Sequence, residues 1–164
     1  MRDIHKSSKA AVVATLQSAA KKFNVSLDTK NVAIAMSQDA VIANAALQNA
    51  AKVKDNELRN GAELLFIYIA PPRNAKWTTL KQKIRPGFYL IRVVIGKDDK
   101  GSKAVLLDQS RREVISLPIR TTPPSHGRPR MFSFFGVSVS IDSCSAGVDY
   151  TRGGVTFFAG VVWC

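Results

Sequence analysis

The feature that most constrains the fold is a block of short apolar runs between residues 63 and 122. The runs are rich in β-branched and aromatic residues, and glycine, proline or clusters of charged residues separate them. They cover residues 63–70, 88–96, 103–108 and 113–120. Runs bounded in this way are typical of consecutive antiparallel strands, because the bounding residues favour turns. The block therefore predicts an antiparallel sheet at the centre of the fold.

The residues before this block predict a mainly helical part. Apolar residues recur at three- and four-residue spacing over 8–23, which predicts an amphipathic helix. Residues 25–36 alternate as short strands would, with a turn at 28–31. The segment 40–54 is rich in alanine, the residue with the highest helix propensity, so it predicts a second helix that ends near Gly61.

The residues after the block divide into a linker and an apolar end. Residues 123–130 are rich in proline, which cannot donate to a ladder, whereas 131–164 are nearly uncharged and aromatic. The apolar end predicts two or three further strands. Together these parts predict an α+β single domain over 1–164. In it, N-terminal helices pack on an antiparallel β-sandwich or compact barrel of about six to eight strands.

The charge of the chain is strongly positive and unevenly distributed. The sequence has 24 Lys and Arg against 12 Asp and Glu, which gives a net charge of +12. Residues 61–130 hold fourteen of these cations and five acids, whereas 131–164 hold one cation and two acids. A field of this size favours an anionic polymer, either glycan or nucleic acid, or an acidic protein as partner. The alternative is a surface that charge only keeps soluble.

The longest basic segment predicts where such a partner would bind. Lys81, Lys83 and Arg85 alternate with uncharged residues, so an extended chain would present all three cations on one face. Lys76 and Trp77 lie just upstream, and an aromatic ring beside cations can stack on a base or sugar. The linker adds two further candidates, Arg128 and Arg130. The alternative interpretation is an edge strand whose cations discourage aggregation.

The two cysteines predict a disulfide. Cys144 and Cys164 each lie near the end of a predicted strand, and a bond between them would close a loop of about 20 residues. Such a disulfide would place the protein in an oxidising compartment, secreted or periplasmic. The alternative is a pair of small buried thiols in a cytosolic protein.

The N-terminus also leaves a choice about export. Arg2, Lys6 and Lys9 precede a short apolar run at 10–16, in the order of a signal peptide, but the run is weak and rich in alanine. We therefore favour a mature exported domain over a cleavable signal. No apolar run reaches the length of about 18 residues that a membrane-spanning helix needs.

A cysteine nucleophile is the sharpest enzymatic alternative. Cys144 lies in a turn of small residues, and His126 or His5 could act as its base. The sequence has no Cys-x-x-Cys or His-x-x-x-His pair and no phosphate-binding glycine loop, so we predict no metal and no cofactor.

These observations favour a non-enzymatic binding or accessory module that engages its partner through a basic face. Three alternatives remain: a nucleic-acid-binding protein, a Cys/His-dependent toxin-type hydrolase or deamidase, and a structural subunit whose aromatic C-terminal strands contact other subunits.

Overall fold

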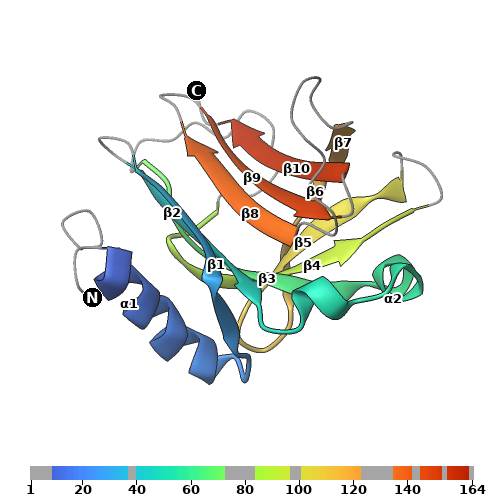
Figure 1. The fold of residues 1–164 in the computed structure, drawn as a ribbon. Helices are drawn as coiled ribbons and strands as arrows, with labels where there is room; N and C mark the ends of the chain where they lie inside the picture. Colours follow the sequence, from blue (N-terminus) through green and yellow to red (C-terminus); the bar gives the residue numbers. More distant parts are fainter. Residues whose placement is uncertain are drawn as a thin grey trace, which may run out of the picture.

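The computed structural model describes residues 9–36, 40–72, 84–96, 101–122, 135–141, 145–152 and 155–162. Within these ranges the chain has an α+β fold with two antiparallel sheets (Figure 1). The elements in chain order are α1 (Lys9–Lys22), β1 (Leu27–Met36), β2 (Val41–Leu47), the 3-10 turn η2 (Ala50–Lys52), α2 (Asp55–Asn60), β3 (Ala62–Ala70), β4 (Gly87–Val94), β5 (Lys103–Leu107), β6 (Glu113–Pro118), β7 (Arg120–Thr122), β8 (Phe135–Ile141), β9 (Ser145–Arg152) and β10 (Val155–Val162).

The larger sheet has six strands in the order β1-β2-β3-β4-β5-β6, so each strand pairs with its neighbour in sequence. All five pairs are antiparallel. The prediction of an antiparallel block is confirmed, since its four apolar runs form β3, β4, β5 and the pair β6 and β7.

Helix α1 covers one face of this sheet and confirms the predicted N-terminal helix. Val12 and Leu16 are buried in the core with 1% of their surface exposed. After the last turn, the ring of Phe23 packs edge-on against Phe66 of β3 at a centroid distance of 5.1 Å. Lys21 and Lys22 lie in the last turn of the helix, where cations favour the negative end of the helix dipole.

The second predicted helix, over 40–54, is wrong. The segment forms β2, the short turn η2 and the two residues that lead to the six-residue helix α2. β2 is buried along its whole length between β1 and β3, and its small residues allow layers to approach closely on both faces. Tertiary burial has overridden the helix propensity of alanine. The helix that Gly61 ends is α2, where its φ of +91° is a value that glycine favours.

The predicted turn at 28–31 is an irregularity within one long strand. The pairing of β1 with β2 shifts between Asp28 and Val32. The carboxylate of Asp28 accepts hydrogen bonds from the Lys30 amide at 3.0 Å and from Asn31 Nδ2 at 2.6 Å. The first bond satisfies the Lys30 amide where the ladder is interrupted, and the second joins the two side chains across the bend.

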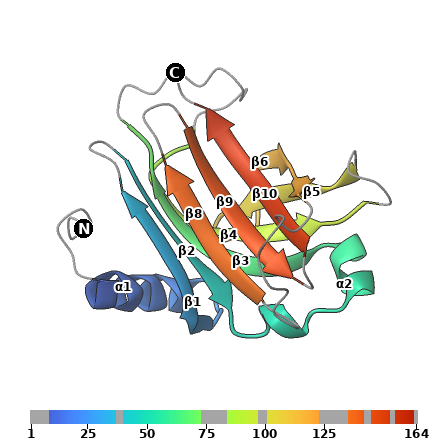
Figure 2. The same ribbon diagram turned by 45° about the horizontal axis from the view of Figure 1, so that its top comes forward.

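The second sheet has the order β7-β10-β9-β8. One residue, Ile119, separates β6 in the first sheet from β7 in the second, and β8 lies against β1 and β2. Figures 1 and 2 show this sheet and α1 on opposite faces of the larger sheet. The predicted compact barrel is wrong, because the larger sheet is open with β1 and β6 as its edges. The ten strands within the described ranges also exceed the predicted six to eight.

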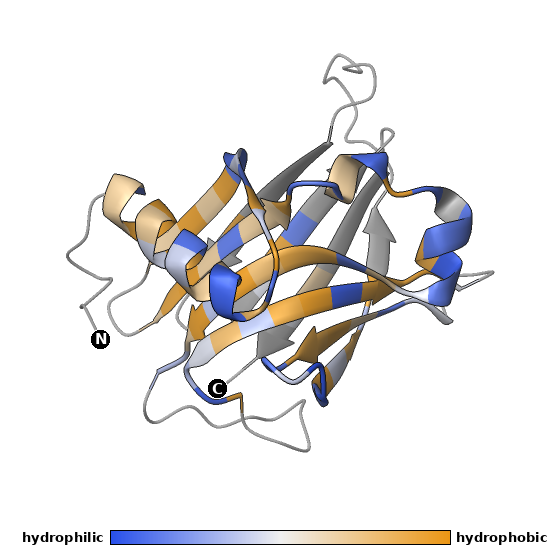
Figure 3. Cartoon of the chain, turned by 90° about the horizontal axis from the view of Figure 1, so that it is seen from below, coloured by the Kyte–Doolittle hydropathy of each residue, from blue (hydrophilic) through white to orange (hydrophobic). Residues whose placement is uncertain are grey.

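The core follows the central strands, where apolar residues predominate along β2 to β5 (Figure 3). Among the described residues two polar side chains are buried, Asn44 and Ser102. The Ser102 hydroxyl accepts a hydrogen bond from the Gly96 amide at 3.0 Å. In contrast, neither Nδ2 nor Oδ1 of Asn44 has a partner in the described part of the chain. No helix within the described ranges is long and apolar enough to span a membrane.

Candidate functional site

The predicted basic segment connects β3 to β4. Ile69 and Gly87 are ladder partners, so the connection over 71–86 leaves and re-enters the sheet at adjacent positions. The partners Met36 and Val41 place the connection from β1 to β2 at the same end of the sheet. The connection from β3 to β4 holds five cations and no acid. The sequence between Ile69 and Gly87 is therefore strongly basic, and Arg85 is its described cation.

The structure describes the C-terminal end of this connection, residues 84–86. Ile84 is buried with 3% of its surface exposed, whereas the next residue, Arg85, is exposed. The Tyr89 hydroxyl donates a hydrogen bond of 2.6 Å to the Arg85 carbonyl oxygen. Burial raises the pKa of Tyr89, and the nearby charge of Arg85 acts in the opposite direction. Ile84 and Tyr89 thus fix the backbone of Arg85 and leave its side chain in solvent.

The other predicted site residues lie outside the described residues. These are Lys76, Trp77, Lys81, Lys83, Arg128, Arg130, Cys144, Cys164 and His126. The common face of three cations and the Cys144–His126 pair therefore stay predictions. Ser145 and Val162 are partners in the ladder of β9 and β10, and Cys144 and Cys164 lie one and two residues beyond them in the sequence. Neither cysteine is among the described residues, so the predicted disulfide stays a prediction.

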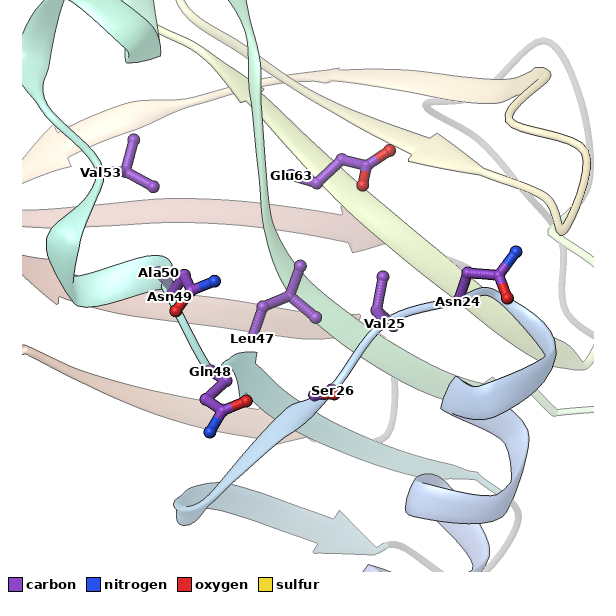
Figure 4. Close-up of a pocket in the computed structure, with 9 residues that line it drawn as sticks. All are labelled: Asn24, Val25, Ser26, Leu47, Gln48, Asn49, Ala50, Val53 and Glu63. Carbon is purple, nitrogen blue, oxygen red and sulfur yellow. The ribbon is translucent and has the colours of Figure 1, made fainter.

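A pocket at the opposite end of the larger sheet was not predicted from the sequence. Its volume is about 340 Å³, at the lower end of the range of about 300–1,000 Å³ that is usual for ligand pockets. Figure 4 shows that its residues come from the α1–β1 connection, the end of β2 with η2, and the start of β3. The lining residues are Asn24, Val25, Ser26, Leu47, Gln48, Asn49, Ala50, Val53 and Glu63.

The pocket has an apolar floor and a polar rim. Leu47 and Ala50 are buried, and Val25 and Val53 are half-buried. The exposed rim consists of four neutral polar residues, Asn24, Ser26, Gln48 and Asn49. Asn49 precedes η2 but its side chain makes no capping hydrogen bond. The amide groups of the rim can both donate and accept hydrogen bonds.

Glu63 is the charged residue of the pocket, and a second residue holds its carboxylate. Arg111 Nε donates to Glu63 Oε1 at 2.9 Å, and Arg111 Nη2 donates to the Phe23 carbonyl oxygen at 2.6 Å. The guanidinium therefore joins the β5–β6 turn to β3 and to the end of α1. Glu63 is thus the one charged lining residue, and Arg111, which lies behind the lining, balances its charge through this ion pair.

A second, more apolar cavity of about 420 Å³ lies beside the edge strand β1. Val12, Val32, Ile34 and Val139 contribute to its wall, and Met36 at its margin is 47% exposed. It contains one charged residue, Lys9. In the described ranges no three His, Cys, Asp or Glu side chains gather as metal ligands would.

Comparisons of the chain with protein-family models, with curated proteins and with solved structures give no match.

Proposed function

We propose that this protein is a non-catalytic binding module whose β3–β4 connection engages a polymer with repeated phosphate or sulfate groups. One observation carries the proposal: five cations and no acid occupy a connection of sixteen residues that begins and ends on adjacent strands. Anionic polymers bind such segments because several cations displace condensed counterions at once.

The C-terminal end of the connection, residues 84–86, supports this proposal. The hydrogen bond from Tyr89 and the burial of Ile84 hold the Arg85 backbone in place. A cation on a fixed backbone loses less conformational freedom on binding than one on a free chain. Arg85 would therefore form the constant part of the contact, and the cations before it would extend it.

Retention on a heparin column tests the proposal. The triple variant Lys81→Gln, Lys83→Gln and Arg85→Gln should elute at clearly lower salt than the unchanged protein. A matched control removes three exposed cations, Lys52, Lys54 and Arg59, from the β2–β3 connection at the opposite end of the sheet. The control carries the same net charge as the triple variant, so a difference between them reports the location of the charge.

Equal elution of the two variants would contradict the proposal, because total charge alone would then explain retention. Binding to single-stranded oligonucleotides separates the two classes of polymer. If nucleic acid is bound through these three cations, the slope of log K against log salt should fall by about 2 in the triple variant. If neither polymer binds but an acidic protein does, the partner class is wrong.

A further inference from the structure

We infer that the pocket lined by Asn24, Gln48, Asn49 and Glu63 binds a small neutral polyhydroxy molecule of the monosaccharide class. The inference is independent of the proposed polymer contact, since the pocket lies at the other end of the sheet from the β3–β4 connection.

Three backbone irregularities from distant parts of the chain converge on this pocket. The first is the left-handed end of α1, where Asn24 has a φ of +58° and the Val25 amide donates to the Ala20 carbonyl oxygen. This conformation turns the chain from the helix into β1 and places Asn24 and Ser26 at the rim.

The second irregularity is the bulge at the start of β3. Glu63 pairs with Arg92 and Leu65 pairs with Ile91, so two steps along β3 correspond to one step along β4. Across the bulge Glu63 falls on the same face of the sheet as Phe66, the face that α1 covers. A regular strand would turn Glu63 to the opposite face, since side chains alternate.

The third irregularity is Arg111, with a φ of +64° in the β5–β6 turn. The Asp108 carboxylate accepts hydrogen bonds of 2.9 Å from the amides of Ser110 and Arg112, which closes the turn around it. Asn24 and Arg111 are the non-glycine residues with positive φ in the described ranges, and both belong to this site. Sparsely populated backbone conformations concentrate at binding sites, where the surrounding structure maintains them.

The chemistry of the wall selects a neutral ligand. An anion would lie beside the Glu63 carboxylate, and a cation would approach Arg111, which lies 2.9 Å from that carboxylate. A polyhydroxy ring matches both parts of the pocket, because its hydroxyl groups can bond to the amides of the rim while its C–H face covers Leu47 and Val25. The volume of about 340 Å³ limits the ligand to a small one.

Titration followed by amide NMR shifts, with D-glucose, D-galactose and N-acetyl-D-glucosamine as probes, tests the inference. At least one probe should cause saturable shifts confined to 24–26, 47–53 and 63. The double variant Gln48→Ala and Asn49→Ala should weaken its binding about tenfold, the loss expected for two neutral hydrogen bonds. The matched control, Gln17→Ala and Asn60→Ala, removes two exposed amides outside the pocket and should leave the affinity unchanged.

Glu63→Gln tests the positioning by Arg111, and it should weaken binding while the NMR spectrum stays folded. Absence of saturable shifts with all three sugars would overturn the inference, as would saturable shifts at these residues with acetate or ethanolamine instead. Heparin retention of the Gln48 and Asn49 variant should equal that of the unchanged protein. The two proposals can therefore fail independently of each other.

Discussion

Asn44 offers the sharpest test of the energetics of the fold. It lies in the middle of β2, its surface is 0% exposed, and its ladder partners are Ala33 and Ile67. Neither polar atom of its side chain has a hydrogen-bond partner among the described residues. A buried donor or acceptor without a partner costs about 1–3 kcal/mol. Replacing this amide with an apolar group of the same shape should therefore stabilise the protein.

Leucine is the matched replacement, since its side chain has the same heavy-atom branching as asparagine. We expect Asn44→Leu to raise the free energy of unfolding by about 2 kcal/mol, because the desolvated amide is removed and overpacking by two methyl groups offsets part of the gain. With an m-value of about 2 kcal/mol per M, the urea midpoint should rise by about 1 M. Circular dichroism during urea unfolding measures this shift.

Two further variants keep this prediction open to refutation. Asn44→Asp places a charge at the same buried position and should destabilise the protein by several kcal/mol, of the order found for unpaired buried charges. Asn60→Leu, at an exposed position, should change the free energy of unfolding by less than about 0.5 kcal/mol. If Asn44→Leu instead lowers the urea midpoint, the amide has a bound partner such as an internal water, and the reasoning is wrong.

Further predictions concern Gly61, Tyr89 and the two cysteines. Gly61→Ala should destabilise the protein by about 1–3 kcal/mol, measured by urea unfolding, because φ is +91° and the new methyl group would meet a β4 side-chain carbon at 3.1 Å. Burial raises the pKa of Tyr89, so its neutral form stabilises the folded state, and the free energy of unfolding should fall as pH rises above about 10. In Tyr89→Phe, which cannot ionise at this position, the free energy of unfolding should fall less over the same pH range. The same variant should cost about 1 kcal/mol at neutral pH through the lost bond to Arg85. Alkylation of the denatured, unreduced protein should find no free thiol if Cys144 and Cys164 are paired, and free thiols at both would exclude the disulfide.

The sequence predicted the antiparallel strands well, because their signals are local. Proline, glycine and charge clusters mark each boundary of β3 to β6, and the three-to-four-residue spacing marks α1. β2 could not be predicted in the same way. A strand buried on both faces shows no alternation, and its small side chains resemble those of a helix until the layers on either side are known.

The two candidate sites also differ in how much of each can be recognised from local sequence. The basic connection is a contiguous stretch of sequence, so its charge is visible without a structure, although among its predicted contact residues Arg85 alone lies in the described ranges. The pocket is not contiguous. Arg111 bonds to Glu63 across 48 positions and to Phe23 across 88. Polar residues at the ends of strands, such as Gln48 and Asn49, were visible in the sequence, but the predicted helix over 40–54 would have distributed them around its surface.

What assembles the pocket is therefore a set of exceptions to regular structure. Without the bulge, Glu63 would face the other side of the sheet, and the guanidinium of Arg111 reaches both of its partners from a residue in the left-handed conformation. Local sequence rules predict regular elements and leave such exceptions out. Each exception has an energetic cost, and regular strand and turn geometry would avoid all three. Their convergence on one polar-rimmed pocket, whose one carboxylate is paired with Arg111, is the physical reason to test that pocket with neutral sugars before any other surface outside the basic connection.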